Sequence, residues 1–557
     1  MEAGNDWMIV NKVVKALITS GLFLSFTSYA QTSLISNVSG YSVNDGVLTP
    51  FSAIAFEGDK VLKLYGKDEP LPKKESIVYI DGEGQTMLPG LIDAHGHVLS
   101  YGLSLMRAQL RGAESESEAV KRVKLFRDAQ PELNWVQGRG WNQVLWPSKS
   151  FPSAKSLDKI FPDTPVWLIR IDGHAGWANS AAMTLSNINA QTQSPEGGEI
   201  IRDASGQPTG VFIDKAMSLI SQNIPSLTQT EQRAVLKLSM KELSKLGLTS
   251  VHDAGVGNDT LEAYLSLAKA DEMPIRIYGM LDADDRHFSE LMKQGPIRLP
   301  EHKLDIASVK ISADGALGSR GAALIEDYSD QEGNNGLLLY PEGEMAKVMK
   351  LAMESGFQVN THAIGDQANK LVLDNYQDLI KETNTGELRH RVEHAQVLRL
   401  EDIPRFAKLN VIASMQATHA TSDKNMALDR LGSERIKGAY AWRRLLESGA
   451  VIAAGSDFPI ESANPFFGLH ASVTRQDQQN RPENGWYSSQ SMTLTQALNS
   501  FTQGAAYAAH QESLIGQLKP GMKADFILVD QDIFAIPASE LWQTQVNQTW
   551  IDGKRIY

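Results

Sequence analysis

The sequence predicts an α/β protein: a (β/α)8 TIM barrel with an inserted subdomain, plus a small β-sandwich-like domain built from both termini. Apolar strand candidates alternate with amphipathic helical stretches through the middle of the 557-residue chain, which is typical of parallel α/β architectures. Eight such strand candidates occur, the number that closes a barrel. Both ends of the chain instead carry short alternating runs separated by glycine-containing turns, which indicate hairpins.

The first thirty residues have the pattern of a secretory signal peptide. Positive charge in NKVVK (residues 11–15) precedes an apolar core at residues 16–26 and a small-residue cleavage site after about Ala30. This apolar core is too short to span a bilayer, so we expect cleavage and no stable membrane anchor. The mature protein is then exported, and the periplasm is its expected location. Translation from Met1 and translation from Met8 are both compatible with this segment.

A single small β-domain is predicted from residues 31–88 and 512–557. The first segment contains the hairpin signals NDG and EGDK, and the second contains short strands with turns such as PGMK and DGK. Neither segment is large enough to form a secure core alone. Pairing between the two is therefore the simplest way to bury the apolar faces of both.

The barrel is predicted at residues 89–511. Its eight strand candidates are GLIDAHGH (90–97), GLTSVHDAG (247–255), IRIYGML (275–281), ASVKISADG (307–315), FQVNTHAIGD (357–366), RHRVEHAQV (389–397), NVIASMQATH (410–419) and AVIAAGSDFP (450–459). The long gap between the first and second candidates must hold the inserted subdomain, at about residues 103–246.

Charge and cysteine content exclude several kinds of site. The net charge of −13 argues against a nucleic-acid partner, because phosphate binding requires clustered Lys and Arg. The chain contains no cysteine, which excludes disulfides, thiolate nucleophiles and thiolate metal sites. Any metal ion would need nitrogen and oxygen ligands. A small-molecule substrate fits this composition, and a homodimer is compatible with it, although no segment marks an interface.

Polar residues fall at the carboxyl ends of the predicted strands, where barrel enzymes carry their catalytic groups. Side chains two apart on a strand share a face. His95 and His97 therefore point together into the mouth of the barrel. By the same alternation Lys310, His362 and Asp457 take inward positions on the fourth, fifth and eighth strands.

The sixth strand fits this alternation less well. His394 ends it, and an inward His394 would turn Arg391 and Glu393 toward the helices, an arrangement for which the sequence offers no reason. His252, His390 and His470 are expected to be packed or surface residues.

Four histidines, one lysine and one aspartate thus converge at one end of the predicted barrel. Neutral imidazoles and a carboxylate are ligands that Zn²⁺, Mn²⁺ or Fe²⁺ accept in the absence of thiolates. A lysine ammonium is a poor ligand. Once carboxylated by CO₂, however, a lysine becomes a carbamate with two oxygens that can bridge two metal ions.

Six segments carry a resemblance to a known family: LPGLIDAHGH, VKISADGALGSRGAAL, THAIGDQA, RVEHAQ, GAYAWRRLLESGAVIAAGSDFPIES and LKPGMKADFILVD. Together they resemble the amidohydrolase superfamily, and most of all its amidohydrolase-3 branch, the YtcJ-like and N-substituted formamide deformylase-like group. The likeness covers nearly all of the mature chain in the same order. One departure from the family pattern is visible after the seventh strand, where Ala417 occupies the position of the proline in the usual Met-Gln-Pro. This change concerns a loop and not a ligand.

The resemblance implies a metal-dependent hydrolase with one or two divalent ions, Zn²⁺ being the expected metal. The implied ligands are His95, His97, Lys310, His362, His394 and Asp457. His95 and His97 would bind the more buried ion, and His362 and His394 would bind the second ion. A carboxylated Lys310 would bridge the two ions. Asp457 would also be the catalytic base.

The implied reaction is hydrolysis of an amide or other non-peptide C–N bond of the N-acyl or N-formyl amine type. Water activated by the metal attacks the carbonyl, and Asp457 passes the proton to the leaving amine. A metal-dependent esterase or lactonase and a deaminase are alternatives on the same scaffold. A non-catalytic periplasmic binding protein is a remote alternative, because none of the six positions is degraded. Candidate substrate contacts are Trp141, His174, Arg320 and His419.

Overall fold

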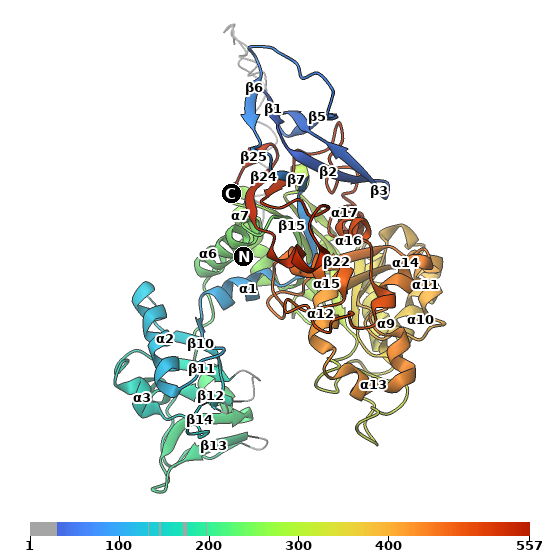
Figure 1. Ribbon diagram of the computed structural model, residues 1–557. Helices are drawn as coiled ribbons and strands as arrows, with labels where there is room; N and C mark the ends of the chain where they lie inside the picture. Colours follow the sequence, from blue (N-terminus) through green and yellow to red (C-terminus); the bar gives the residue numbers. More distant parts are fainter. Residues whose placement is uncertain (1–30, 132, 144–145, 171–174, 196–197) are drawn as a thin grey trace, which may run out of the picture.

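The computed structural model describes residues 31–131, 133–143, 146–170, 175–195 and 198–557 (Figure 1). The predicted signal peptide and His174 lie outside these residues. Figure 1 shows three parts: a β-domain at the top, a barrel in the middle, and an inserted subdomain, coloured cyan to green, that projects at the lower left. Among the described residues we find no helix whose length and apolar character would let it cross a bilayer.

Eight parallel strands form the barrel in the order in which they occur along the chain. They are β8 (Leu91–Gly96), β15 (Leu248–Val256), β16 (Arg276–Asp282), β18 (Leu304–Ser312), β19 (Gln358–Ala363), β20 (Arg391–His394), β21 (Ile412–Gln416) and β22 (Ile452–Gly455). Short β17 (Ile297–Arg298) pairs antiparallel with β18 outside this path. The predicted (β/α)8 barrel is confirmed.

The barrel closes where its first strand meets the segment after its last strand. Gly96 forms a parallel bridge with Phe458. The Asp457 N–H donates to the His95 carbonyl at 2.7 Å, and the His97 N–H donates to the Phe458 carbonyl at 2.8 Å. Both segments that meet at this seam therefore carry predicted site residues.

Helices follow most of the barrel strands, because amphipathic sequences occur between them. These helices are α1 (Val98–Leu105), α6 (Gln229–Ser244), α7 (Asn258–Lys269), α8 (Phe288–Gln294), α9 (Glu344–Glu354), α10 (Asp366–Thr383), α11 (Ile403–Leu409), α12 (Ala417–Asp423), α13 (Ala427–Arg435), α14 (Trp442–Glu447), α15 (Pro465–Thr474), α16 (Leu494–Ser500) and α17 (Gln503–Ala508). A capping box of Thr228 and Glu231 begins α6, which satisfies amide groups at that helix end.

Both termini build the β-domain, as predicted. One sheet has the order β5-β4-β1-β6 and the other has the order β25-β24-β23-β7-β2-β3. The strands are β1 (Thr32–Ser36), β2 (Ser39–Asn44), β3 (Val47–Phe51), β4 (Ala53–Glu57), β5 (Lys60–Tyr65), β6 (Val78–Asp81), β7 (Thr86–Pro89), β23 (Phe526–Val529), β24 (Val546–Ile551) and β25 (Lys554–Arg555). Because β7 pairs with both β2 and β23, the C-terminal strands complete a sheet that the N-terminal segment begins.

The inserted subdomain has its own sheet in the order β13-β14-β12-β11-β10-β9. Its elements are β9 (Ala108–Gln109), α2 (Glu116–Ala129), β10 (Val136–Trp141), α3 (Ala154–Asp158), β11 (Val166–Arg170), β12 (Ala175–Ala178), α4 (Ser180–Leu185), β13 (Gly198–Arg202), β14 (Pro208–Asp214) and α5 (Ser218–Ser221). Trp141, Trp146 and Trp177 pack together in its core.

The C-terminal boundary predicted for the insertion, about residue 246, lies too far along the chain. Helix α6 packs against α1 and α7, and its Leu236, Met240 and Leu243 belong to the core of the barrel. An amphipathic pattern shows that a helix has one buried face, but it does not show which core that face joins.

Candidate metal centre and active site

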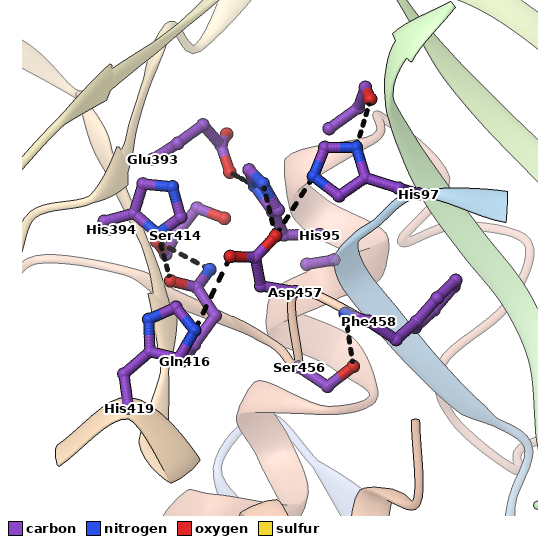
Figure 2. A network of polar contacts seen from close by, with 12 residues as sticks. His95, His97, Glu393, His394, Ser414, Gln416, His419, Ser456, Asp457 and Phe458 are labelled. Carbon is purple, nitrogen blue, oxygen red and sulfur yellow. Dashed lines mark hydrogen bonds and ion pairs between the residues drawn. The ribbon is translucent and has the colours of Figure 1, made fainter. Parts of the chain in front are cut away.

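Three buried side chains from distant parts of the chain form a cluster at the carboxyl ends of the barrel strands. His95, His394 and Asp457 each offer one ligand atom, and these atoms all lie within 4.8 Å of one another. Nε2 of His95 is 3.6 Å from Oδ1 of Asp457. Figure 2 shows both histidine rings beside the Asp457 carboxylate, with His394 to its left and His95 above it. Nitrogen and oxygen donors at this spacing suit a divalent metal ion.

Two more predicted ligands adjoin this cluster. Nε2 of His97 is 3.1 Å from Oδ1 of Asp457. The His362 ring centroid is 4.5 Å from that of His394, while Nε2 of His362 lies 3.4 Å from Oδ1 of Asp314. The side chain of His97 is 30% exposed, whereas that of His95 is fully buried, so the cluster is reached from solvent on the His97 side.

Lys310 lies in the middle of the same group of strands. It is paired in register with Asn360 of β19, two positions before the pair of Ser312 and His362. Burial lowers the pKa of its ammonium group, although the nearby carboxylates of Glu393 and Asp457 act in the opposite direction. A lowered pKa increases the fraction of neutral amine, the form that reacts with CO₂.

Protein acceptors orient three of the imidazoles. Nδ1 of His97 contacts the Ala254 carbonyl at 2.7 Å, and Nδ1 of His394 contacts Oε1 of Gln416 at 2.7 Å. A carbonyl oxygen only accepts hydrogen bonds, so these contacts place a proton on Nδ1 of both rings and make Nε2 the candidate ligand atom. Burial acts to lower the pKa of His97, but Asp457 raises it, so Nε2 of His97 also donates to Asp457 and must lose that proton before it can bind a metal ion.

His95 follows the same pattern, with Glu393 as its acceptor. Its Nδ1 contacts Oε2 of Glu393. Its Nε2 is buried and has no hydrogen-bond partner among the described residues. A buried nitrogen without a partner carries a free-energy cost that a bound metal ion would remove. The chemistry and orientation of these donors therefore fit the metal that the sequence predicts.

Charge states in the cluster also suit metal binding. Burial lowers the pKa of His95 to about 4 and holds the pKa of His394 well below its ordinary value, so both rings are neutral at pH 7. Burial acts to raise the pKa of Asp457, but the hydrogen bond from His97 and the other nearby histidines hold it well below its usual range. Neutral imidazoles beside an ionised carboxylate are the protonation states that ligands require.

The backbone leaves regular strand geometry at two site residues. His394 has φ of 73° and Asp457 has φ of 61°, both in the left-handed region that non-glycine residues rarely adopt. Such conformations cluster at functional sites, where the surrounding structure maintains them. At His394 the positive φ places a side chain that strand alternation alone would not.

This geometry corrects the predicted orientation of Arg391 and Glu393. Both side chains are fully buried, and Arg391 reaches the Ala94 carbonyl of β8 at 2.6 Å, so they lie inside the barrel and not on its helical side. The prediction counted alternation back from His394. Because φ is positive at His394, its side chain reaches the site while the residue before it also faces inward.

Two buried aspartates that the sequence reasoning passed over hold the site together. Asp93 accepts hydrogen bonds from the His95 N–H at 3.0 Å and from Oγ of Ser456 at 2.6 Å, which joins β8 to the end of β22. Asp314 accepts from the N–H groups of Ala323 and Gly365, which joins the loops after β18 and β19. The sequence does contain a sign of the role of Asp93, because this residue is a charged side chain inside the apolar run LIDAHGH.

The predicted substrate contacts occupy different surroundings. Nε2 of His419, on α12, lies 3.5 Å from Oδ2 of Asp457, and its ring stacks on that of His394. Arg320 instead donates two hydrogen bonds to Asp330. Trp141 is fully buried in the core of the subdomain, where its ring has no surface left for a ligand. His419 is thus the described candidate that adjoins the cluster.

A cavity of about 620 Å³ lies beside α9 and α10, apart from this cluster. Its lining includes Leu338, Tyr340, Met345 and Leu371 and none of the predicted metal ligands. The arrangement of ligands, not the size of a cavity, therefore locates the candidate active site.

Comparisons with known proteins identify a family and several similar sequences. The model of the amidohydrolase family matches residues 78–557. The chain is 32% identical over 511 residues to the protein YtcJ of Bacillus subtilis (strain 168), covering 90% of this chain and 94% of that protein. It is 27% identical over 489 residues to N-substituted formamide deformylase of Arthrobacter pascens, covering 85% of this chain and 89% of that protein.

A solved structure is similar as well. The crystal structure of an uncharacterized metal-dependent hydrolase from Pyrococcus furiosus superposes with a TM-score of 0.74 and is 26% identical. The match covers 90% of this chain and 99% of that one. The similarity therefore extends over the barrel, the β-domain and the insertion.

Proposed function

Because the chain belongs to the amidohydrolase family, whose fold it shares with metal-dependent hydrolases, we propose that it hydrolyses an amide or other non-peptide C–N bond in a small molecule. The single observation that carries this proposal is the buried cluster of His95, His394 and Asp457, with His97 against the same carboxylate. The likeness to N-substituted formamide deformylase supports N-formyl and N-acyl amines as the substrate class.

The proposed cofactor is one or two divalent ions, with Zn²⁺ as the expected metal. The residues that would hold it are His95, His97, Lys310 as its carbamate, His362, His394 and Asp457. When bound, such an ion lowers the pKa of water toward about 7 and polarises the substrate carbonyl. The lowered pKa of Lys310 supports its carboxylation.

Asp457 is the proposed base. Its carboxylate is ionised at neutral pH and holds Oδ1 toward His97 and Oδ2 toward His419. It accepts a proton from the attacking water and delivers it to the nitrogen of the leaving amine as the C–N bond breaks. His419 lies on the Oδ2 side, where it can donate a hydrogen bond to the substrate.

A substrate panel on the full chain tests the proposal. We expect Zn²⁺-loaded protein to release amine from N-formyl and N-acyl amines, and chelated protein to release none. Turnover confined to esters and lactones, or release of ammonia from an aminated ring, would replace the proposal with the esterase or deaminase alternative. Metal binding without turnover of any class would favour a binding protein.

We also propose that the protein is exported to the periplasm after cleavage near Ala30, and that it acts on a small molecule without a nucleic-acid partner or a membrane anchor. Export is checked by the N-terminal sequence of protein recovered from the periplasm. A homodimer is the proposed oligomer, which light scattering of the purified chain measures directly.

A further inference from the structure

His95 lies between two carboxylates. Its Nδ1 contacts Oε2 of Glu393, and its Nε2 faces Oδ1 of Asp457 at 3.6 Å (Figure 2). His95 and Glu393 are both fully buried. One side of the ring is therefore occupied by a protein acceptor, and the other side is directed at the candidate metal centre.

Arg391 holds the Glu393 carboxylate from the same strand. Its Nε approaches Oε1 of Glu393 at 2.7 Å as an ion pair, at an angle that does not suit a hydrogen bond, and its Nη2 donates to Oε2 at 3.1 Å. Its Nη2 also donates to the Ala94 carbonyl and to Oγ of Ser414, and its Nη1 contacts Nδ1 of His252 at 2.9 Å. Arg391 thus joins β8, β15, β20 and β21.

A buried ion pair of this kind needs an explanation other than stability. Barrel interiors are filled mainly by branched apolar side chains. Desolvation of two charges costs several kcal/mol per ion, and replacing such a pair by apolar residues is often neutral. Both oxygens of Glu393 contact Arg391, and one also contacts His95, so neither is left to face a metal ion.

We propose that Glu393 is a positioning residue for His95: it holds the proton on Nδ1 and aims Nε2 at the metal centre, while Arg391 holds Glu393 in place. This inference rests on the metal site of the proposed function. A carboxylate that accepts from a ligand histidine fixes the ring and strengthens its nitrogen as a donor, and its loss typically weakens metal binding about 10- to 100-fold.

The Glu393→Gln variant tests this role, because glutamine has the same shape but only one acceptor oxygen. Its NH₂ group must face either Nε of Arg391 or Nδ1 of His95, and both of these are donors. We expect Zn²⁺ affinity, measured by competition with a chelator, to fall about 10- to 100-fold. The visible spectrum of the Co²⁺-loaded variant should also change, because it reports ligand geometry.

Asp525→Asn is the matched control. Asp525 and Arg276 form another buried carboxylate–guanidinium pair, at the opposite end of the barrel strands. This control should lose thermal stability but keep wild-type Zn²⁺ affinity and Co²⁺ spectrum. Should Glu393→Gln fail to fold, Glu393→Asp keeps the charge and shortens the side chain, and it should also bind Zn²⁺ more weakly than the wild type.

Three results separate the possible failures. Wild-type affinity and spectrum in a folded Glu393 variant would overturn the positioning role. Loss of a whole metal equivalent at saturating Zn²⁺ would also overturn it and make Glu393 a direct ligand. If the wild-type chain itself binds no metal, the proposed function fails as well.

Discussion

Nε2 of His97 lies 3.1 Å from Oδ1 of Asp457, although 360 positions separate the two residues in the chain. His97 follows the first barrel strand and Asp457 follows the last, so the contact crosses the seam at which the barrel closes. The seam that closes the barrel therefore also brings two residues of the candidate metal centre together.

Asp457→Asn should remove the proposed base while keeping the shape of the side chain. We expect kcat to fall by about 10²- to 10⁴-fold, because an amide cannot accept the proton. Steady-state kinetics measure the loss, and metal content and melting temperature are recorded beside them. A rate near that of the wild type would refute Asp457 as the base.

Removal of the metal should abolish activity and lower the melting temperature. A metal that binds only the folded state adds about 2.7 kcal/mol of stability at a free concentration of 100 Kd. Chelation followed by Zn²⁺ re-addition should therefore remove and restore both turnover and thermal stability. Full activity in protein shown by elemental analysis to be metal-free would contradict the proposal.

Lys310→Ala should lose one metal ion if Lys310 is a carbamate bridge. Short carboxylic acids such as acetate should restore part of the metal content and activity, because their two oxygens can occupy the vacated position. Elemental analysis with and without the acid provides the measurement. Complete metal occupancy in the variant, with no effect of added acid, would indicate an unmodified lysine.

His390 should make the metal-free protein sensitive to acid. Its ring is fully buried, its Nδ1 accepts from the Val359 N–H at 3.0 Å, and burial lowers its pKa to about 3 from an unfolded value near 6.5. The unfolded chain therefore binds the proton more readily, and stability of up to about 5 kcal/mol, complete above pH 6.5, is lost as the pH falls toward 3.

His390→Asn removes this titration and keeps an acceptor for the Val359 N–H. Between pH 6.5 and pH 4, the melting temperature of the chelated variant should fall less than that of the chelated wild type. Parallel losses in the two proteins would show that His390 does not contribute to the acid sensitivity.

Strand alternation predicted the inward positions of several site residues because it depends only on local backbone geometry. Lys310 pairs with Asn360 and Ser312 pairs with His362, so Lys310 and His362 lie two register positions apart on β18 and β19, as counting by two along each strand requires. The same counting failed on β20, because the positive φ at His394 is maintained by surrounding contacts that a count along the strand does not contain.

Contacts between distant segments explain what sequence reasoning missed. Trp141 has a side chain of a type that often binds ligands, yet it packs on Trp146 and Trp177 in the core of the subdomain. Glu393 has a charged side chain and is therefore expected to face outward, yet it contacts His95 across the barrel. The residues next to Trp141 and Glu393 in the sequence do not indicate either contact.

The amino-acid sequence by itself determined the order of strands and helices, the barrel that follows from them and the supply of nitrogen and oxygen donors at strand ends, because periodicity and composition are local properties. Only the tertiary structure decided which donors meet, which imidazole nitrogen faces the centre and which core receives helix α6. Those outcomes depend on closure of the barrel and on side-chain packing, which bring together residues hundreds of positions apart.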